Sequence, residues 1–408
     1  MKKTLVALAA FASVSSFAQQ LPSGANPNPT QNGVAITGAL DVGYGALTYQ
    51  GGNKFNGVSY NGTTTSQIDF SGVEDLGGGM KADFWFESDI NPTTAYNTGV
   101  PSFNGLNTSA TAQASTVSSG VQAASTWGNG QVKVGLGGAF GYVAAGAVNN
   151  ALLDANQWSS PFGTAYGSGF GITSTASGGG YGSSAKVRYD NSVRYLTPEL
   201  VSGLRLSLVY RGKNDAPANS DFSSTSGWQA LSGVREIAGI YSQGPLNLAY
   251  VNQVDDGNGV AGTPLTATTT SGVSSGARFS NNTLAVNYTM GATTIYGGLQ
   301  NVSNDTTTAN KTSRYGVQYV MGQWTFKAAY SSLKTATNTQ STVTGFGADY
   351  ALSKMTSLYV RDEHVNDGAG KLASDLATSA ANGVVAAGYA TSTDSVRNRL
   401  MVGVRTSF

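Results

Sequence analysis

The amino-acid sequence predicts an all-β chain that folds as a transmembrane antiparallel β-barrel of about sixteen strands, with short turns on one rim and long loops on the other. Three observations lead to this fold class. Polar and apolar side chains alternate with a period of two in segments along the whole chain, the first residues resemble a secretory signal, and charged residues are scarce.

The alternation is clearest in residues 394–408. On an extended strand one face carries Leu400, Val402, Val404, Thr406 and Phe408. The opposite face carries Arg397, Arg399, Met401, Gly403, Arg405 and Ser407. A strand that is apolar on one face and bears several arginines on the other fits a barrel wall between lipid and water. A buried sandwich strand would have to pair each of these arginines.

The N-terminus predicts a secretory signal peptide over residues 1–18, so that residues 19–408 form the barrel domain. Lys2 and Lys3 precede the short apolar run 5–12, and Ser16 and Ala18 have the small-x-small spacing of a cleavage site. The apolar run is too short to span a bilayer of about 30 Å as a helix.

The composition agrees with export into a membrane. Charged residues make up 11% of the chain, against about 25% in an average soluble domain. Cysteine is absent, which excludes a disulfide framework. No apolar stretch after the signal is long enough for a membrane helix, and a formal net charge of +1 argues against a nucleic-acid partner.

Alternation bounded by turn residues places the strands in order along the chain. The predicted strands are 33–50, 64–75, 80–90, 119–127, 131–137, 184–196, 203–211, 232–242, 245–253, 278–290, 292–302, 312–321, 323–333, 341–353, 356–367 and 394–408. In 203–211 four leucine or tyrosine side chains alternate with arginine and serine, and 312–321 and 323–333 show the same two faces. At 232–242 neither face is cleanly apolar.

The connections predict the two rims of the barrel. Tight-turn residues occur at 77–79, 128–130, 244–245 and 321–322, whereas long Gly-, Ser-, Thr- and Asn-rich connections are expected at 91–118, 138–183, 254–277 and 368–393. An even number of strands places both termini at the short-turn rim, which is periplasmic in outer-membrane barrels.

Three segments carry a family resemblance. The segment Ser66–Glu87, SQIDFSGVEDLGGGMKADFWFE, resembles the second and third strands of general porins of Gram-negative outer membranes, especially the beta-proteobacterial branch. Residues 191–195 with Pro198 and Glu199 resemble the strand after that family's constriction loop, and 402–408 resemble its last strand.

The resemblance implies an outer-membrane homotrimer, in contact with lipid and lipopolysaccharide, that passes small hydrophilic solutes by passive diffusion. It also implies that Phe408 is the signal read by the barrel-assembly machinery. We expect the trimer contacts on the first and last strands, where the small residues Ala39, Gly43 and Gly45 would permit close packing.

In this family the third loop folds into the lumen and forms the constriction, which here corresponds to about 138–183. The constriction candidates in it are Asn149, Asn150, Asp154 and Gln157. Asp154 is the one acid of this loop, and it could equally accept hydrogen bonds within the loop.

The predicted pore wall has fewer cations than relatives carry. Gln67 and Ser71 stand where relatives often have arginine, and Leu136 replaces another arginine, so the resemblance and its departures predict a weakly charge-selective pore. The further wall candidates are Asp69, Asp83, Trp85, Glu87, Lys133, Lys186, Arg188, Arg194, Arg205, Arg361, Arg397 and Arg399. Trp85 could stack on sugar rings or pack under a folded loop.

Two other classes of function are weighed against the pore. An enzyme is disfavoured, because the single histidine, His364, and its neighbour Glu363 point to opposite faces of a strand. No cluster of histidines and cysteines suggests a metal, so no cofactor or metal is expected. The remaining alternative is a plugged barrel that serves as a structural or adhesive surface protein.

Overall fold

The computed structural model describes residues 33–52, 54–90, 92–93, 128, 130–170, 187–213, 233–256, 278–304, 307–335, 338–368 and 395–408. The predicted signal peptide, the predicted strand 119–127 and the wall candidate Lys186 lie outside the described residues.

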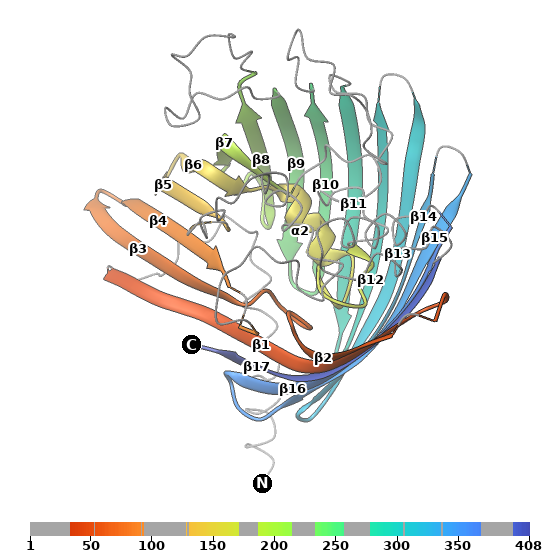
Figure 1. Ribbon diagram of the computed structural model, residues 1–408. Helices are drawn as coiled ribbons and strands as arrows, with labels where there is room; N and C mark the ends of the chain where they lie inside the picture. The colour runs from red at the N-terminus through yellow and green to blue at the C-terminus, as the bar shows by residue number, and fades with distance from the viewer. Residues whose placement is uncertain are drawn as a thin grey trace, which may run out of the picture.

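The described part of the chain is almost entirely β-strand (Figure 1). The strands are β1 (Gly33–Tyr49), β2 (Lys54–Tyr60), β3 (Gln67–Gly77), β4 (Met80–Asp89), β5 (Val132–Gly138), β6 (Gly141–Asn149), β7 (Arg188–Leu196), β8 (Leu204–Arg211), β9 (Val234–Gln243), β10 (Leu246–Asp255), β11 (Phe279–Met290), β12 (Thr293–Asn304), β13 (Thr307–Met321), β14 (Trp324–Lys334), β15 (Gln340–Ala351), β16 (Thr356–Asp367) and β17 (Val396–Ser407). The helix α2 (Ala151–Trp158) follows β6. Among the described residues, no helix has the length and apolar character needed to cross a membrane.

The strands close into an antiparallel barrel. β1 pairs with β17 on one side, and on the other side it pairs with β2 over Val42–Thr48 and with β3 over Gly33–Ala39. Since β2 and β3 together fill one place in the ring, the seventeen strand elements make a sixteen-stranded wall. The predicted fold class is therefore confirmed.

Two strands differ from the prediction. β6 lies inside the segment predicted as a long loop, and the short turn that precedes it is 138–141. Along β6 both faces carry small or apolar residues, such as Val143 outside and Ala144 inside. The alternation of polar and apolar residues that marks the other strands is therefore missing from its sequence. The short strand β2 was also missed in the connection before 64.

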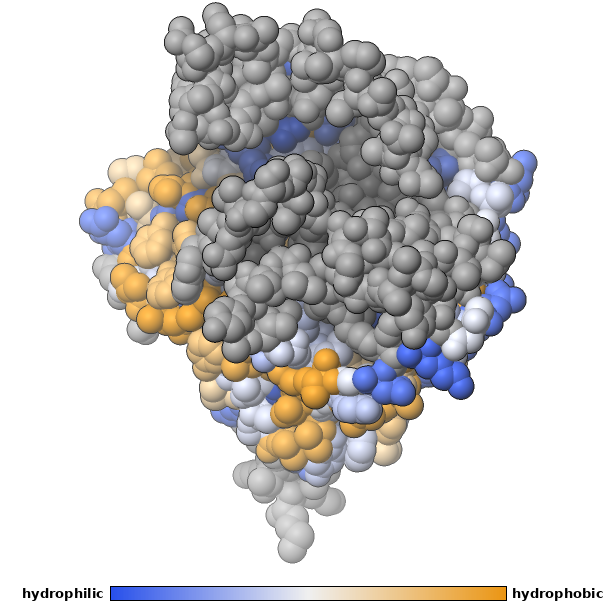
Figure 2. All heavy atoms as spheres, viewed as in Figure 1, coloured by the Kyte–Doolittle hydropathy of each residue, from blue (hydrophilic) through white to orange (hydrophobic). Residues whose placement is uncertain are grey.

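The in-and-out alternation agrees with a membrane wall. Val402, Leu400 and Tyr44 are exposed on the outer surface, and Figure 2 shows hydrophobic residues gathered there. Arg397 and Arg399 point inward and are buried. The inner wall around these arginines is therefore polar, as an aqueous lumen requires.

The predicted trimer-packing residues of β1 do not reach the outer surface. A Cβ at Gly43 would meet the buried Met401 side chain, one at Gly45 would approach Ser59, and Ala39 is buried. Because side chains alternate along a strand, the outward residues of β1 are its even-numbered ones, so this expectation was wrong.

Candidate functional site

The chain turns onto the inner face of the wall after β6. The helix α2 contacts β9, β10, β11 and β12 on their concave side (Figure 1). Its buried apolar side chains, Leu152 and Trp158 among them, join a cluster with inward wall residues such as Ala249, Val251 and Ala285. The hydrophobic core of the protein therefore lies between the helix and one side of the wall, because burying this face stabilises the helix there.

A wall carboxylate holds the start of α2. The backbone N–H of Ala151 donates to Glu236 Oε1 at 2.8 Å, and Gln253 Nε2 donates to Glu236 Oε2 at 2.8 Å. Asn150 is the N-cap, and its side chain accepts from Leu153 N–H at 3.4 Å. A negative group at a helix N-terminus is favourable because the first N–H groups have no intrahelical partner.

The predicted residues Asn149, Asp154 and Arg194 come together behind the helix. Arg194 Nη2 lies 3.1 Å from Asp154 Oδ2, and both side chains are 1% exposed. Arg194 Nη1 also donates to the backbone oxygen of Asn149, the last residue of β6, at 2.9 Å. The Asp154 carboxylate thus faces the wall, and Gln157 is the more exposed of the predicted helix residues.

The turn after α2 rests on small inward residues of four successive wall strands. A Cβ on Gly298 would lie 2.5 Å from Ser159 Cβ, and one on Gly316 would overlap the Pro161 ring. Gly316, Ala329 and Gly345 are aligned across β13, β14 and β15. These three residues and the nearby Gly298 and Gly347 leave the space that the turn occupies, and we call the set the glycine seat (Gly298, Gly316, Ala329, Gly345 and Gly347).

The far end of the turn is tied to β16 and β17. The Glu363 carboxylate accepts from Gly167 N–H at 2.9 Å and lies 2.8 Å from Arg397 Nη2 and 3.2 Å from Arg399 Nη2. The Arg399 guanidinium lies 3.8 Å from the centre of the Tyr166 ring. Burial raises the pKa of Tyr166 to about 12, so this hydroxyl stays neutral at physiological pH.

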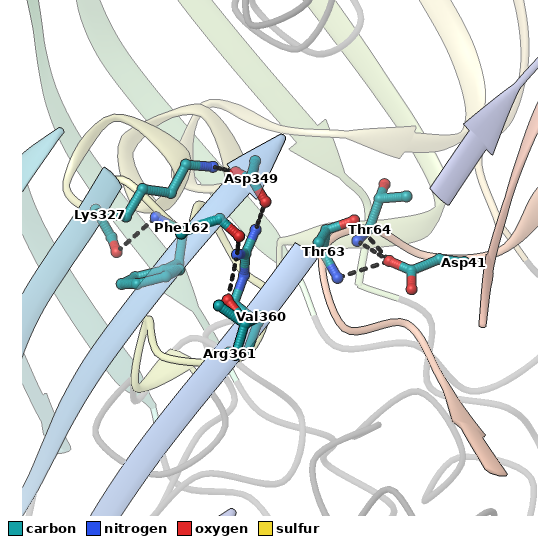
Figure 3. Close-up of polar contacts among 10 residues, drawn as sticks. Asp41, Thr63, Thr64, Phe162, Lys327, Asp349, Val360 and Arg361 are labelled. Carbon is teal, nitrogen blue, oxygen red and sulfur yellow. Dashed lines mark hydrogen bonds and ion pairs between the residues drawn. The ribbon is translucent and has the colours of Figure 1, made fainter. Parts of the chain in front are cut away.

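A second group of ion pairs, centred on Asp349, lies on the same wall (Figure 3). Asp349 lies between Lys327 and Arg361, at 3.1 Å and 2.5 Å from their nitrogens. The Arg361 guanidinium also lies 5.5 Å from the centre of the Phe162 ring, which belongs to the inserted turn. A cation over an aromatic ring is attractive, so this contact helps to hold the turn at Phe162 against the wall.

The connection 61–66, between β2 and β3, leaves the wall and is held by Asp41. The Asp41 carboxylate accepts from Thr63 N–H at 2.6 Å, from Thr64 N–H at 3.0 Å and from the Tyr359 hydroxyl at 2.5 Å. Figure 3 shows the carboxylate pointing at both threonines. Next to this connection the Tyr166 hydroxyl donates to the carbonyl oxygen of Tyr60, the last residue of β2, at 3.4 Å.

The remaining predicted wall residues are spread over β3, β4, β5, β7 and β8. Lys133 pairs with Asp83 at 3.1 Å, Arg188 lies 3.7 Å from Glu87, and Trp85 Nε1 donates to Glu87 at 3.4 Å. Gln67 donates to Asp69 at 3.0 Å.

Two predicted positions remain: Leu136 lies on the outer face of the wall, whereas Arg205 lies opposite the inward Ile240 and so on the inward face of β8. Lys133 and Gly135 face inward, whereas the exposed Val134 faces outward and shares its face with Leu136. Leu136 therefore does not line the lumen, and the expectation that it replaces a wall arginine was wrong. Arg205 lies near the short-turn rim and pairs there with Glu199.

Sequence reasoning missed four inward carboxylates. Glu236 and Glu363 hold the inserted segment 150–170, Asp41 holds the connection 61–66, and Asp349 pairs with Lys327 and Arg361. The signal that could have found them is their position on predicted strands, where alternation places their side chains on the inward face. Glu363 was considered only beside His364, which points outward and contacts Asn398.

Comparisons with known proteins agree with this architecture. A family model described as Gram-negative porin matches residues 4–370. The chain is 38% identical over 92 residues to outer membrane porin protein 32 of Delftia acidovorans and 28% identical over 267 residues to major outer membrane protein P.IB of Neisseria gonorrhoeae. These matches cover 22% and 62% of this chain, and 23% and 62% of the two curated relatives, which is less than two thirds of either.

Solved structures share the fold at low sequence identity. An anion-selective porin from Comamonas acidovorans superposes with a TM-score of 0.63 at 19% identity, over 93% of this chain and all of the other. The trimer form of OmpT from Vibrio cholerae gives a TM-score of 0.54 at 14% identity, over 92% of this chain and 99% of the other.

Proposed function

Because this chain belongs to the Gram-negative porin family and forms a closed barrel of the outer membrane, we propose that it conducts ions and small hydrophilic solutes by passive diffusion. The observation that carries this proposal is the polar inner wall of a sixteen-stranded barrel, since a barrel of that size encloses more space than side chains fill.

The narrowest section of the channel is formed by the inserted segment 150–170 together with the facing segment 61–66. The anchors at Glu236, Arg194 and Glu363 support this proposal, since they hold both ends of the inserted segment against the wall. The side chains of this segment that are not fully buried, and so line the opening, are Leu153, Gln157, Thr164, Ala165 and Phe170.

The channel is weakly charge-selective. Lys133, Arg194 and Arg361 each contact a carboxylate, so local fields largely cancel at the positions where free cations would attract anions. Gln67 and Ser71 add no cation to this wall. The structural relative from Comamonas is described as anion-selective, and these pairs are the reason to expect a weaker preference here.

The protein assembles as a homotrimer in contact with outer-membrane lipid and lipopolysaccharide. The trimer form of a structural relative supports this proposal. Phe408 pairs its backbone with Gly38 at 3.0 and 3.1 Å and exposes its ring on the outer surface. That ring is therefore available to the barrel-assembly machinery while the last strand pairs with the first.

Planar-bilayer recording of the purified protein across a salt gradient tests the proposal. Stepwise conductance that closes in thirds at high voltage, with a small zero-current potential, is the expected result. A strong anion potential would refute the weak selectivity alone. Absence of conductance from folded, heat-modifiable protein would refute the channel and favour the plugged barrel that serves as a structural or adhesive protein.

A further inference from the structure

Arg314 on β13 is a buried cation that no carboxylate balances. Its side chain points inward beneath the end of α2 and is 4% exposed. In the part of the chain that the structure describes, it forms no ion pair, in contrast to Arg194, Arg361, Arg397 and Arg399 on the same inner wall.

The hydrogen bonds of Arg314 are incomplete as well. Nη1 donates to Asn156 Oδ1 at 2.5 Å and to Ser159 Oγ at 3.2 Å, whereas Nε and Nη2 are buried and have no hydrogen-bond partner. A buried guanidinium with unmade bonds is costly, because it loses its hydration and gains neither a counter-charge nor acceptors in return. The N–H groups of these two nitrogens therefore point to an acceptor that the protein itself does not supply.

A small cavity adjoins these groups between α2 and β11, β12 and β13. Its volume is about 10 Å³, which admits one particle of the size of a water molecule. Its polar lining consists of Asn156, Ser159, Thr283, Gln300, Thr312 and Arg314. The Ser159 and Thr283 hydroxyls already donate to Asn156 O and Asn281 Oδ1, so Arg314 is the donor that carries the site, and no carboxylate lines the cavity to repel an anion.

We propose that this cavity binds one small monovalent anion, of the chloride class, on Arg314 Nε and Nη2. An anion supplies the missing charge as well as the missing acceptor, whereas a water molecule supplies only the acceptor. Since Asn156 and Ser159 belong to the end of α2, the bound anion fastens the inserted segment to the wall.

Bromide diffraction tests the site directly on the wild-type protein. Crystals grown in sodium bromide are expected to show an anomalous peak within hydrogen-bond distance of Arg314 Nη2. Density for water alone, with no anomalous signal at bromide concentrations up to about 1 M, would overturn the proposal. This outcome is independent of whether the protein conducts, so it separates the anion site from the proposed channel.

Thermal unfolding in solution gives a second readout. At constant ionic strength, replacing gluconate by chloride is expected to raise the temperature at which the folded form is lost by about 2 °C, because an anion that binds only the folded state stabilises it. Arg314→Gln is expected to abolish this rise, and the control Arg205→Gln, at an exposed arginine, to keep it. Equal unfolding temperatures of the wild type in the two salts would contradict the inference.

Discussion

Glu363→Gln is the sharpest perturbation of the inserted segment. The substitution keeps the shape of the side chain but removes the one negative charge that two buried arginines and the Gly167 N–H share. All three partners lie within 3.2 Å of a carboxylate oxygen, and the side chain is 2% exposed. Screening by solvent is therefore small.

The expected cost follows from the two ion pairs. At these separations the attraction of Glu363 to each arginine is about 5 kcal/mol at an effective dielectric constant of about 20, before desolvation is subtracted. Measured losses on breaking buried pairs are about 3–5 kcal/mol. Taking about 3 kcal/mol as the loss at this anchor, detachment of the 166–167 end becomes about a hundredfold more frequent, since 1.4 kcal/mol is a factor of ten.

Single-channel recording and a salt gradient measure both consequences. Detachment should appear as open-channel current fluctuations, and the loss of one negative charge beside two arginines should shift the zero-current potential toward anion preference. The matched control is Glu199→Gln, whose partner Arg205 is 41% exposed, so the expected effect there is below about 1 kcal/mol. If Glu363→Gln has the open-channel noise and the ion preference of the wild type, Glu363 does not anchor the segment.

Three further predictions concern neighbouring contacts. Gly316→Ala should displace the Pro161 turn and lower the free energy of unfolding in urea by about 1–3 kcal/mol. The control Gly297→Ala, on the outer face, should not lower it. Equal urea midpoints for the two variants would disprove the glycine seat. Asp41→Asn should speed amide exchange in 61–66 by about tenfold or more, because charged acceptors make stronger bonds, and unchanged protection would argue against this anchor. Gln67→Arg should move the zero-current potential toward anions; no movement would place residue 67 outside the conducting path.

The strand pattern decided which residues form the wall and which way each points. Alternation is a local property of extended backbone, and contact with lipid or water selects the side chains on each face. For this reason the parity of Arg397, Arg399 and Lys327 could be assigned from the sequence. The same reasoning failed at β6, where both faces are small or apolar, and at the short β2.

The candidate site was only partly accessible from the sequence. Asp154 and Arg194 were both candidates for the lumen, but their pairing behind the helix was not foreseen. Arg314 and the carboxylates Glu363 and Asp349 were passed over, because an inward position alone does not show which charge an arginine meets.

Only the closed tertiary structure decided the partners. Asp41 accepts from the Tyr359 hydroxyl across 318 residues of chain, because closure places β1 beside β17 and near β16. Gly167 reaches Glu363 across 196 residues, because the inserted segment crosses the inner wall to β16. The local pattern fixes the direction of each side chain within its own strand. The closure of the ring and the position of the inserted segment decide which distant charges share a buried site. The periodicity of a single strand carries no information on either.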